Sequence, residues 1–68
     1  MFNYKVEFSY LPGIAKNRIR QSVVCTAESC QEAANMARWG HCQLDGMRVE
    51  RIWKETVTGS WMAVNAWR

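Results

Sequence analysis

The sequence predicts an α+β fold in which a single helix packs on one face of an antiparallel four-stranded sheet. Two segments with strand-like alternation precede one capped helical segment, and two more strand-like segments follow it. Turn-forming residues separate the strands of each pair, which favours two hairpins joined by the helix. These elements use nearly all of the 68 residues, so we expect one domain, residues 1–68.

The first predicted strand, residues 2–10, has the alternation of a half-buried strand. Its apolar positions are Phe2, Tyr4, Val6, Phe8 and Tyr10, and its polar positions are Asn3, Lys5, Glu7 and Ser9. Pro12 and Gly13 then favour a turn. The second strand is expected over residues 18–26. One of its faces carries Ile19, Val23 and Cys25, and the other carries Arg18, Arg20 and Ser22.

A capping box predicts where the helix begins. Ser29 can accept a hydrogen bond from a free backbone N–H, and Glu32 can reach back to it. Helical spacing then produces a stripe of small side chains that lets the helix lie close to a sheet: Cys30, Ala33, Ala34 and Ala37. Gly40 is expected to end the helix in the left-handed conformation. Trp39, in the last turn, either covers the edge of the sheet or stays exposed.

The third predicted strand, residues 47–55, has an ambiguous alternation. Val49 and Ile52 are both apolar but have opposite parity. Either a β-bulge or an edge position with both faces partly covered resolves that conflict. Thr58 and Gly59 favour the turn into a fourth strand over residues 61–67. A right-handed crossover through the helix places the third strand beside the first, so the expected strand order is 2-1-3-4.

Composition and charge narrow the functional classes. The net charge of +3 favours an acidic partner or nucleic acid at low salt. Three cysteines cannot all pair within the chain, and no segment resembles a signal peptide or a membrane span. We therefore expect an intracellular, reducing compartment and no membrane contact.

The sequence contains little that predicts catalysis or a cofactor. His41 with Cys25, Cys30 and Cys42 has the composition of some zinc sites. Zinc knuckles bring two thiolates together on a turn, however, whereas the four residues between Cys25 and Cys30 join the end of a strand to the start of a helix. We interpret the cysteines as buried reduced thiols and expect no metal and no cofactor. No nucleophile has an evident base and orienting carboxylate, so we do not expect an enzyme.

Basic residues are expected to gather on the face of the sheet that the helix leaves open. Strand parity places Lys5, Arg18, Arg20 and Arg48 there. Three interpretations stay open: a solvated face whose charges pair with Glu7 and Glu50, a contact for an acidic protein surface, and a contact for phosphates.

Several segments resemble the small phage-encoded anti-CRISPR proteins, in particular a type I-F inhibitor of similar length. The resemblance is carried by Thr26–Ser29, Ala34, Ala37, Cys42, Met47–Glu50 and Thr56–Ala63, roughly the last two-thirds of the chain. It implies a β-β-α-β-β protein that docks on the backbone subunits of a CRISPR surveillance complex and blocks hybridisation of target DNA. It also implies a location in the cytoplasm of an infected bacterial host.

The leading hypothesis is therefore a non-enzymatic phage inhibitor of a type I CRISPR surveillance (Cascade) complex. Its expected partner-binding residues are Lys5, Lys16, Asn17, Arg18, Arg20 and Arg48, and secondary candidates on the helix are Gln31, Asn35 and Arg38. Replacing Arg18 and Arg20 by Glu is expected to abolish inhibition and leave the melting temperature nearly unchanged.

Two other functions stay open at this point. The first is a small nucleic-acid-binding module that uses the basic face, with Trp39 or Trp53 as stacking platforms. The second is a structural or assembly protein of a phage particle. The sequence leaves the oligomeric state open.

Overall fold

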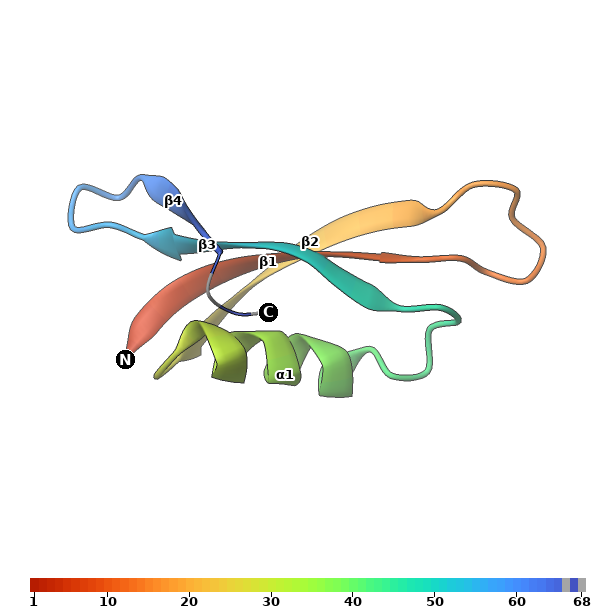
Figure 1. Ribbon diagram of the computed structural model, residues 1–68, viewed down its shortest axis with the longest axis horizontal. Helices are drawn as coiled ribbons and strands as arrows, with labels where there is room; N and C mark the ends of the chain where they lie inside the picture. Colours follow the sequence, from red (N-terminus) through yellow and green to blue (C-terminus); the bar gives the residue numbers. More distant parts are fainter. Residues whose placement is uncertain (66, 68) are drawn as a thin grey trace.

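Four strands and one helix form a two-layer structure (Figure 1). The computed structural model describes residues 1–65 and Trp67. Its elements, in chain order, are β1 Phe2–Tyr10, β2 Ile19–Ala27, α1 Cys30–Gly40, β3 Arg48–Glu55 and β4 Trp61–Val64. The strands form one antiparallel sheet in the order β2-β1-β3-β4. Both the predicted fold class and the predicted strand order are confirmed.

The helix lies on one face of the sheet, and we call the other the open face (Figure 1). The stripe of small residues predicted for α1 faces the sheet, because Ala33, Ala34 and Ala37 are all buried. They pack against the side of β1 that carries Tyr4 and Val6. Side chains as small as alanine let the helix approach the sheet closely. The apolar alternation of β1 thus decides which face forms the core.

The two ends of α1 differ in how well the sequence predicted them. Ser29 is the N-cap, and its hydroxyl accepts a hydrogen bond from the Glu32 backbone N–H at 3.2 Å, as the capping box predicts. The prediction for Gly40 is wrong, because Gly40 belongs to the helix and has no positive φ. His41 caps the C-terminus instead. Its ring lies 4.4 Å from the Phe8 ring, centroid to centroid, and its Nδ1 lies 2.9 Å from the Ala37 carbonyl oxygen.

A β-bulge in β3, the first of the two explanations considered, resolves the ambiguous alternation. Glu7 lies opposite Arg51 and Phe8 lies opposite Val49, so Glu50 has no partner in β1. Residues directly opposite in an antiparallel pair point to the same side of the sheet. Val49 and Ile52 therefore both face the helix.

The fourth strand is shorter than predicted. It ends at Val64 and pairs only with the Ile52–Glu55 part of β3. Trp67 was expected in this strand, but its side chain is buried in the core beneath the sheet. Ala66, also expected in this strand, lies outside the described residues. The Trp67 ring therefore adds to the core instead of extending β4.

Candidate functional site: a basic sheet face

Strand register gathers charged side chains on the open face. Ser9 of β1 lies opposite Arg20 of β2 on one side and Arg48 of β3 on the other, so these side chains form a row across three strands. Further along, Lys5 lies opposite Trp53, and Glu7 lies opposite Arg51. Among the described residues, the basic side chains of this face are Lys5, Arg18, Arg20, Arg48 and Arg51, and the acidic ones within its strands are Glu7, Glu50 and Glu55.

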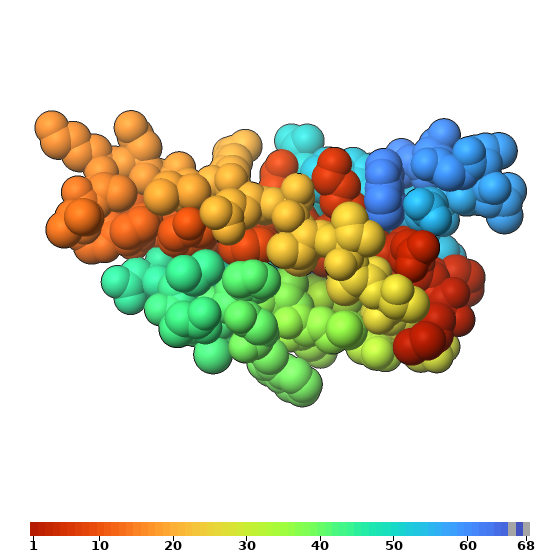
Figure 2. All heavy atoms as spheres, turned by 180° about the vertical axis from the view of Figure 1, so that it is seen from behind, coloured from red at the N-terminus to blue at the C-terminus, as the bar shows by residue number. Residues whose placement is uncertain are grey.

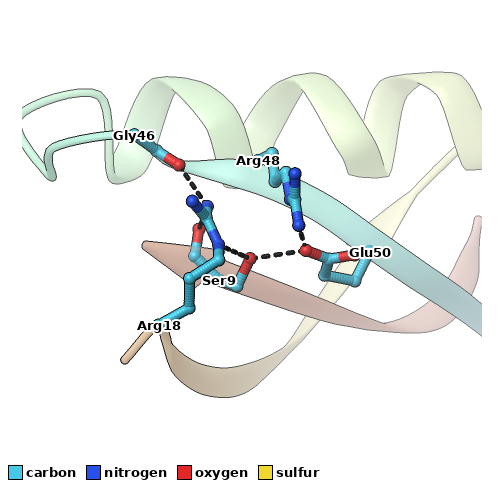
Figure 3. Close-up of polar contacts among 5 residues, drawn as sticks. All are labelled: Ser9, Arg18, Gly46, Arg48 and Glu50. Atoms are coloured by element: carbon cyan, nitrogen blue, oxygen red, sulfur yellow. Dashed lines mark hydrogen bonds and ion pairs between the residues drawn. The ribbon is translucent and has the colours of Figure 1, made fainter. Parts of the chain in front are cut away.

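The hydroxyl of Ser9 is the centre of a polar cluster (Figure 3). It accepts a hydrogen bond from Arg18 Nε at 3.0 Å and donates one to Glu50 Oε1 at 2.5 Å. Glu50 Oε1 also accepts from Arg48 Nε at 2.6 Å. Ser9 is fully buried although it lies on the open face, because Arg18 and Glu50 cover it. The cluster joins the end of β1 to the beginnings of β2 and β3.

Arg18 makes two more hydrogen bonds, and both are to the backbone. Its Nη2 donates to the Ser9 carbonyl oxygen at 3.3 Å and to the carbonyl oxygen of Gly46 (Figure 3). Gly46 has a φ of +63°, which permits the turn that brings its carbonyl toward the guanidinium. The Arg18 side chain is therefore held by hydrogen bonds within the fold. The sequence predicted that replacing Arg18 together with Arg20 leaves the melting temperature nearly unchanged. The contacts of Arg18 do not fit that prediction.

The other predicted contact residues differ in how freely they are presented. Arg20 is exposed, and so are Lys16 and Asn17 in the loop between β1 and β2. Arg48 is exposed but paired with Glu50. The Lys5 ammonium lies 5.5 Å from the centroid of the Trp53 ring, a cation–π distance. Arg20 is thus the predicted contact residue of the strands that is best placed to meet a partner.

The secondary candidates lie on the exposed side of α1. Gln31, Asn35 and Arg38 are exposed, and Arg38 Nη1 donates to Asn35 Oδ1 at 3.0 Å. Trp39 is 77% exposed, so it does not cover the edge of the sheet. The helix and the open face lie on opposite sides of the molecule (Figure 1). One flat partner surface therefore cannot contact both groups at once.

Sequence reasoning missed three residues of the open face. Arg51 and Trp61 lie there, and Trp61 is a diagonal neighbour of Trp53 because Trp53 pairs with Ala63 and Glu55 with Trp61. Ser9 was interpreted only as an alternating polar position. The bulge could have predicted the position of Arg51. One extra residue in β3 makes Arg51 face the side of the sheet opposite to that of Val49.

The thiols do not form a metal site. Among residues 1–65 and Trp67, no group of three His, Cys, Asp or Glu side chains is placed to hold a metal ion. All three cysteines are free, and Cys25 and Cys30 are half-buried. The expectation of buried thiols is wrong for Cys42, which is exposed. Burial raises the pKa of the Cys25 thiol, and the nearby Glu32 carboxylate raises it further, so its reactive thiolate is disfavoured.

In the part of the chain that the structure describes, no helix combines the length and the apolar character needed to cross a membrane.

Replacing Arg18 by Met is expected to lower the free energy of unfolding by about 1–3 kcal/mol, because the Ser9 and Gly46 acceptors lose a charged donor. The measurement is a urea unfolding curve. Arg20→Met is the matched control, since Arg20 is exposed, and is expected to change stability by no more than about 0.5 kcal/mol. Equal midpoints for the two variants would show that the cluster does not support the fold.

Glu50 is expected to make stability depend on pH. The Ser9 hydroxyl, and then Arg48, hold the pKa of Glu50 below its usual value of 4.5. A carboxylate with a lowered folded-state pKa contributes stability above its unfolded-state pKa, and that contribution is lost as the pH falls through the folded-state pKa. Wild type should therefore exceed Glu50→Gln in stability at neutral pH, and thermal melts should show the difference shrinking below pH 4.5. A difference that stays constant down to about pH 3 would contradict this assignment.

Comparison of this chain with known protein families, with curated proteins and with solved structures found no match.

Proposed function

We propose that this chain is a non-enzymatic inhibitor that uses its basic sheet face to dock on a type I CRISPR surveillance complex and block target DNA binding. The observation that carries the proposal is the row of Arg20, Ser9 and Arg48 across three strands, with Arg51 further along β3 on the same face. The resemblance of the sequence to small anti-CRISPR proteins supplies the identity of the partner. The site of action is then the cytoplasm of an infected bacterial host, and the backbone subunits of the complex are the contacted surface.

The chemistry of the open face supports docking. Arg20 and Arg51 are exposed, and a guanidinium can bind a carboxylate or a phosphate with two parallel hydrogen bonds. The cluster around Ser9 holds Arg48 in place before any partner arrives. A side chain that is already ordered loses less conformational entropy on binding. The face therefore combines free guanidinium groups with a fixed one.

The potential catalytic groups support a non-enzymatic role. The His41 ring packs on Phe8, and its Nδ1 must donate to the Ala37 carbonyl oxygen, because a carbonyl only accepts. The Cys25 thiol has a raised pKa. The His41 ring is thus held within the fold, and the reactive thiolate form of Cys25 is disfavoured.

Arg20→Glu is expected to weaken inhibition at least tenfold, because the variant places a carboxylate at the β2 end of the basic row. Losing a desolvated charge pair at an interface typically costs about 2–5 kcal/mol. The assay follows binding of labelled target DNA to the purified surveillance complex while the inhibitor is titrated. Arg38→Glu makes the same charge change on the helix and should inhibit as wild type does. If only Arg38→Glu fails to inhibit, the helix is the contact surface and the proposed sheet face is wrong.

A second function is favoured by two tryptophans on the basic face. Trp53 and Trp61 lie diagonally across β3 and β4, and Trp53 also lines a hollow of about 310 Å³ together with Arg51 and Asn65, among others. Aromatic rings next to cationic groups are how many sheets bind single-stranded nucleic acid. Trp39, the other predicted stacking platform, is on the helix side, away from the basic face. The alternative is therefore a small module that binds single strands through Trp53 and Trp61.

The salt dependence of binding distinguishes the two proposed functions. Direct contact of Lys5, Arg20 and Arg51 with three phosphates should weaken binding of a fluorescent single-stranded oligonucleotide roughly 20-fold between 50 and 200 mM salt. Docking on a protein surface through desolvated contacts should lose less affinity over the same range of salt.

Trp61→Ala should weaken oligonucleotide binding by about 1–3 kcal/mol, whereas the matched control Trp39→Ala should not. Absence of oligonucleotide binding even at 50 mM salt would exclude the nucleic-acid module.

A further inference from the structure

Among the described residues, one edge of the sheet is a long strand whose outer side has no partner strand. β2 ends the strand order and pairs only with β1, along all nine of its residues. Figure 2 shows this strand, orange to yellow, running uncovered along one side of the molecule. Its outer edge therefore presents backbone N–H and C=O groups that no other strand satisfies.

This edge lacks the features that usually prevent strands from pairing between molecules. Natural sheets protect their edges with proline, with bulges or with several charged side chains. β2 contains no proline and no glycine, its register with β1 is unbroken, and Arg20 is its only charged residue. Val24, one residue past the middle of the strand, is 63% exposed. An edge with these properties is suited to pairing with another strand.

We propose that β2 pairs, antiparallel, with β2 of a second copy of this chain. The two-fold axis of this dimer passes between the two Val24 residues. In this register each residue lies opposite the one equally far from Val24 in the other copy. On the open face Val24 meets Val24, Ser22 meets Thr26, and Arg20 meets Glu28 of the other copy. The pairs are apolar with apolar, hydroxyl with hydroxyl, and cation with carboxylate, which are the combinations that stabilise antiparallel strands.

Charge complementarity selects both the occupant and the register. Among the symmetric registers centred on residues 22–26, only the one centred on Val24 sets Arg20 opposite Glu28. Glu28 directly follows β2 and is exposed, so its carboxylate is available. On the helix side this register places Val23 opposite Cys25, both half-buried in the single chain. The strand is thus complementary to itself on both faces, as a two-fold interface requires.

The two helices of the dimer do not obstruct the pairing of the sheets. A two-fold axis perpendicular to the sheet leaves both helices on one side and both open faces on the other. The two four-stranded sheets then form one continuous sheet, and their basic faces lie side by side. This inference does not depend on the identity of the partner that the basic face binds.

Sedimentation equilibrium of the purified chain tests the dimer. Wild type should approach twice the chain mass as its concentration rises. Val24→Lys sets two ammonium groups opposite each other at the axis and should weaken dimerisation at least tenfold. Val57→Lys, the same change in the fully exposed β3–β4 turn, should not. A wild type that stays monomeric at every concentration, or a dimer that Val24→Lys leaves intact, overturns the proposal.

Charge exchange tests the register. Arg20→Glu alone places a carboxylate opposite Glu28 at both ends of the interface, and Glu28→Arg alone places two guanidinium groups there. Each single variant should weaken the dimer, and the double variant Arg20→Glu/Glu28→Arg should restore it. A double variant that dimerises no better than the single ones overturns this register.

A disulfide provides a second test that does not rely on disrupting the interface. In a Cys42→Ser background, which removes the exposed native thiol, Val24→Cys should form an intermolecular disulfide across the axis. Ser22→Cys is the matched control, because its residue lies opposite Thr26 of the other copy. Far-UV circular dichroism confirms that each variant is folded. If Ser22→Cys cross-links as fast as Val24→Cys under the same oxidant, the proposed register is wrong.

Discussion

Glu50 has no partner in β1, and the arrangement of the basic face depends on this one extra residue of β3. Without the bulge, strict alternation would send either Val49 or Ile52 to solvent. With it, both reach the core while Arg48 and Arg51 emerge on the open face. The unpaired residue is also the carboxylate that accepts from Ser9 and Arg48. One local irregularity thus satisfies the core and organises the charges above it.

Most of the fold could be predicted because local signals agree with each other. The alternation of β1, the cap at Ser29 and the small-residue stripe of α1 are encoded by neighbouring residues, and each appears in the structure. The fold predictions that were wrong concern the ends of a helix and a strand, where contacts with residues distant in the sequence determine the last residue of the element. His41 rather than Gly40 ends the helix because its ring packs on Phe8. Trp67 leaves the expected fourth strand because the core accepts its ring.

The basic face could be predicted only in part. Parity alone placed Lys5 and Arg20 correctly, since each belongs to a strand with a clear alternation, and Arg48 was also placed correctly although the alternation of its strand is ambiguous. The role of Arg18 depends on Ser9 and Gly46, which lie on other segments of the chain, so no local pattern contains it. Strand register likewise decides that Trp53 and Trp61 are neighbours. Contacts between segments distant in the sequence are therefore what the structure adds.

The central position of β1 has a consequence for how the chain folds during its synthesis. β1 and β2 leave the ribosome first and can form their hairpin at once, but the other edge of β1 pairs with β3, whose residues are made later. At typical rates of translation, the last residue of β3 follows the last residue of β2 by roughly one to six seconds. Throughout that interval the apolar side of β1, with Val6 and Phe8, lacks its final neighbours. Completion of the sheet is thus timed by translation, and the nascent hairpin exposes a second unpaired edge until β3 arrives.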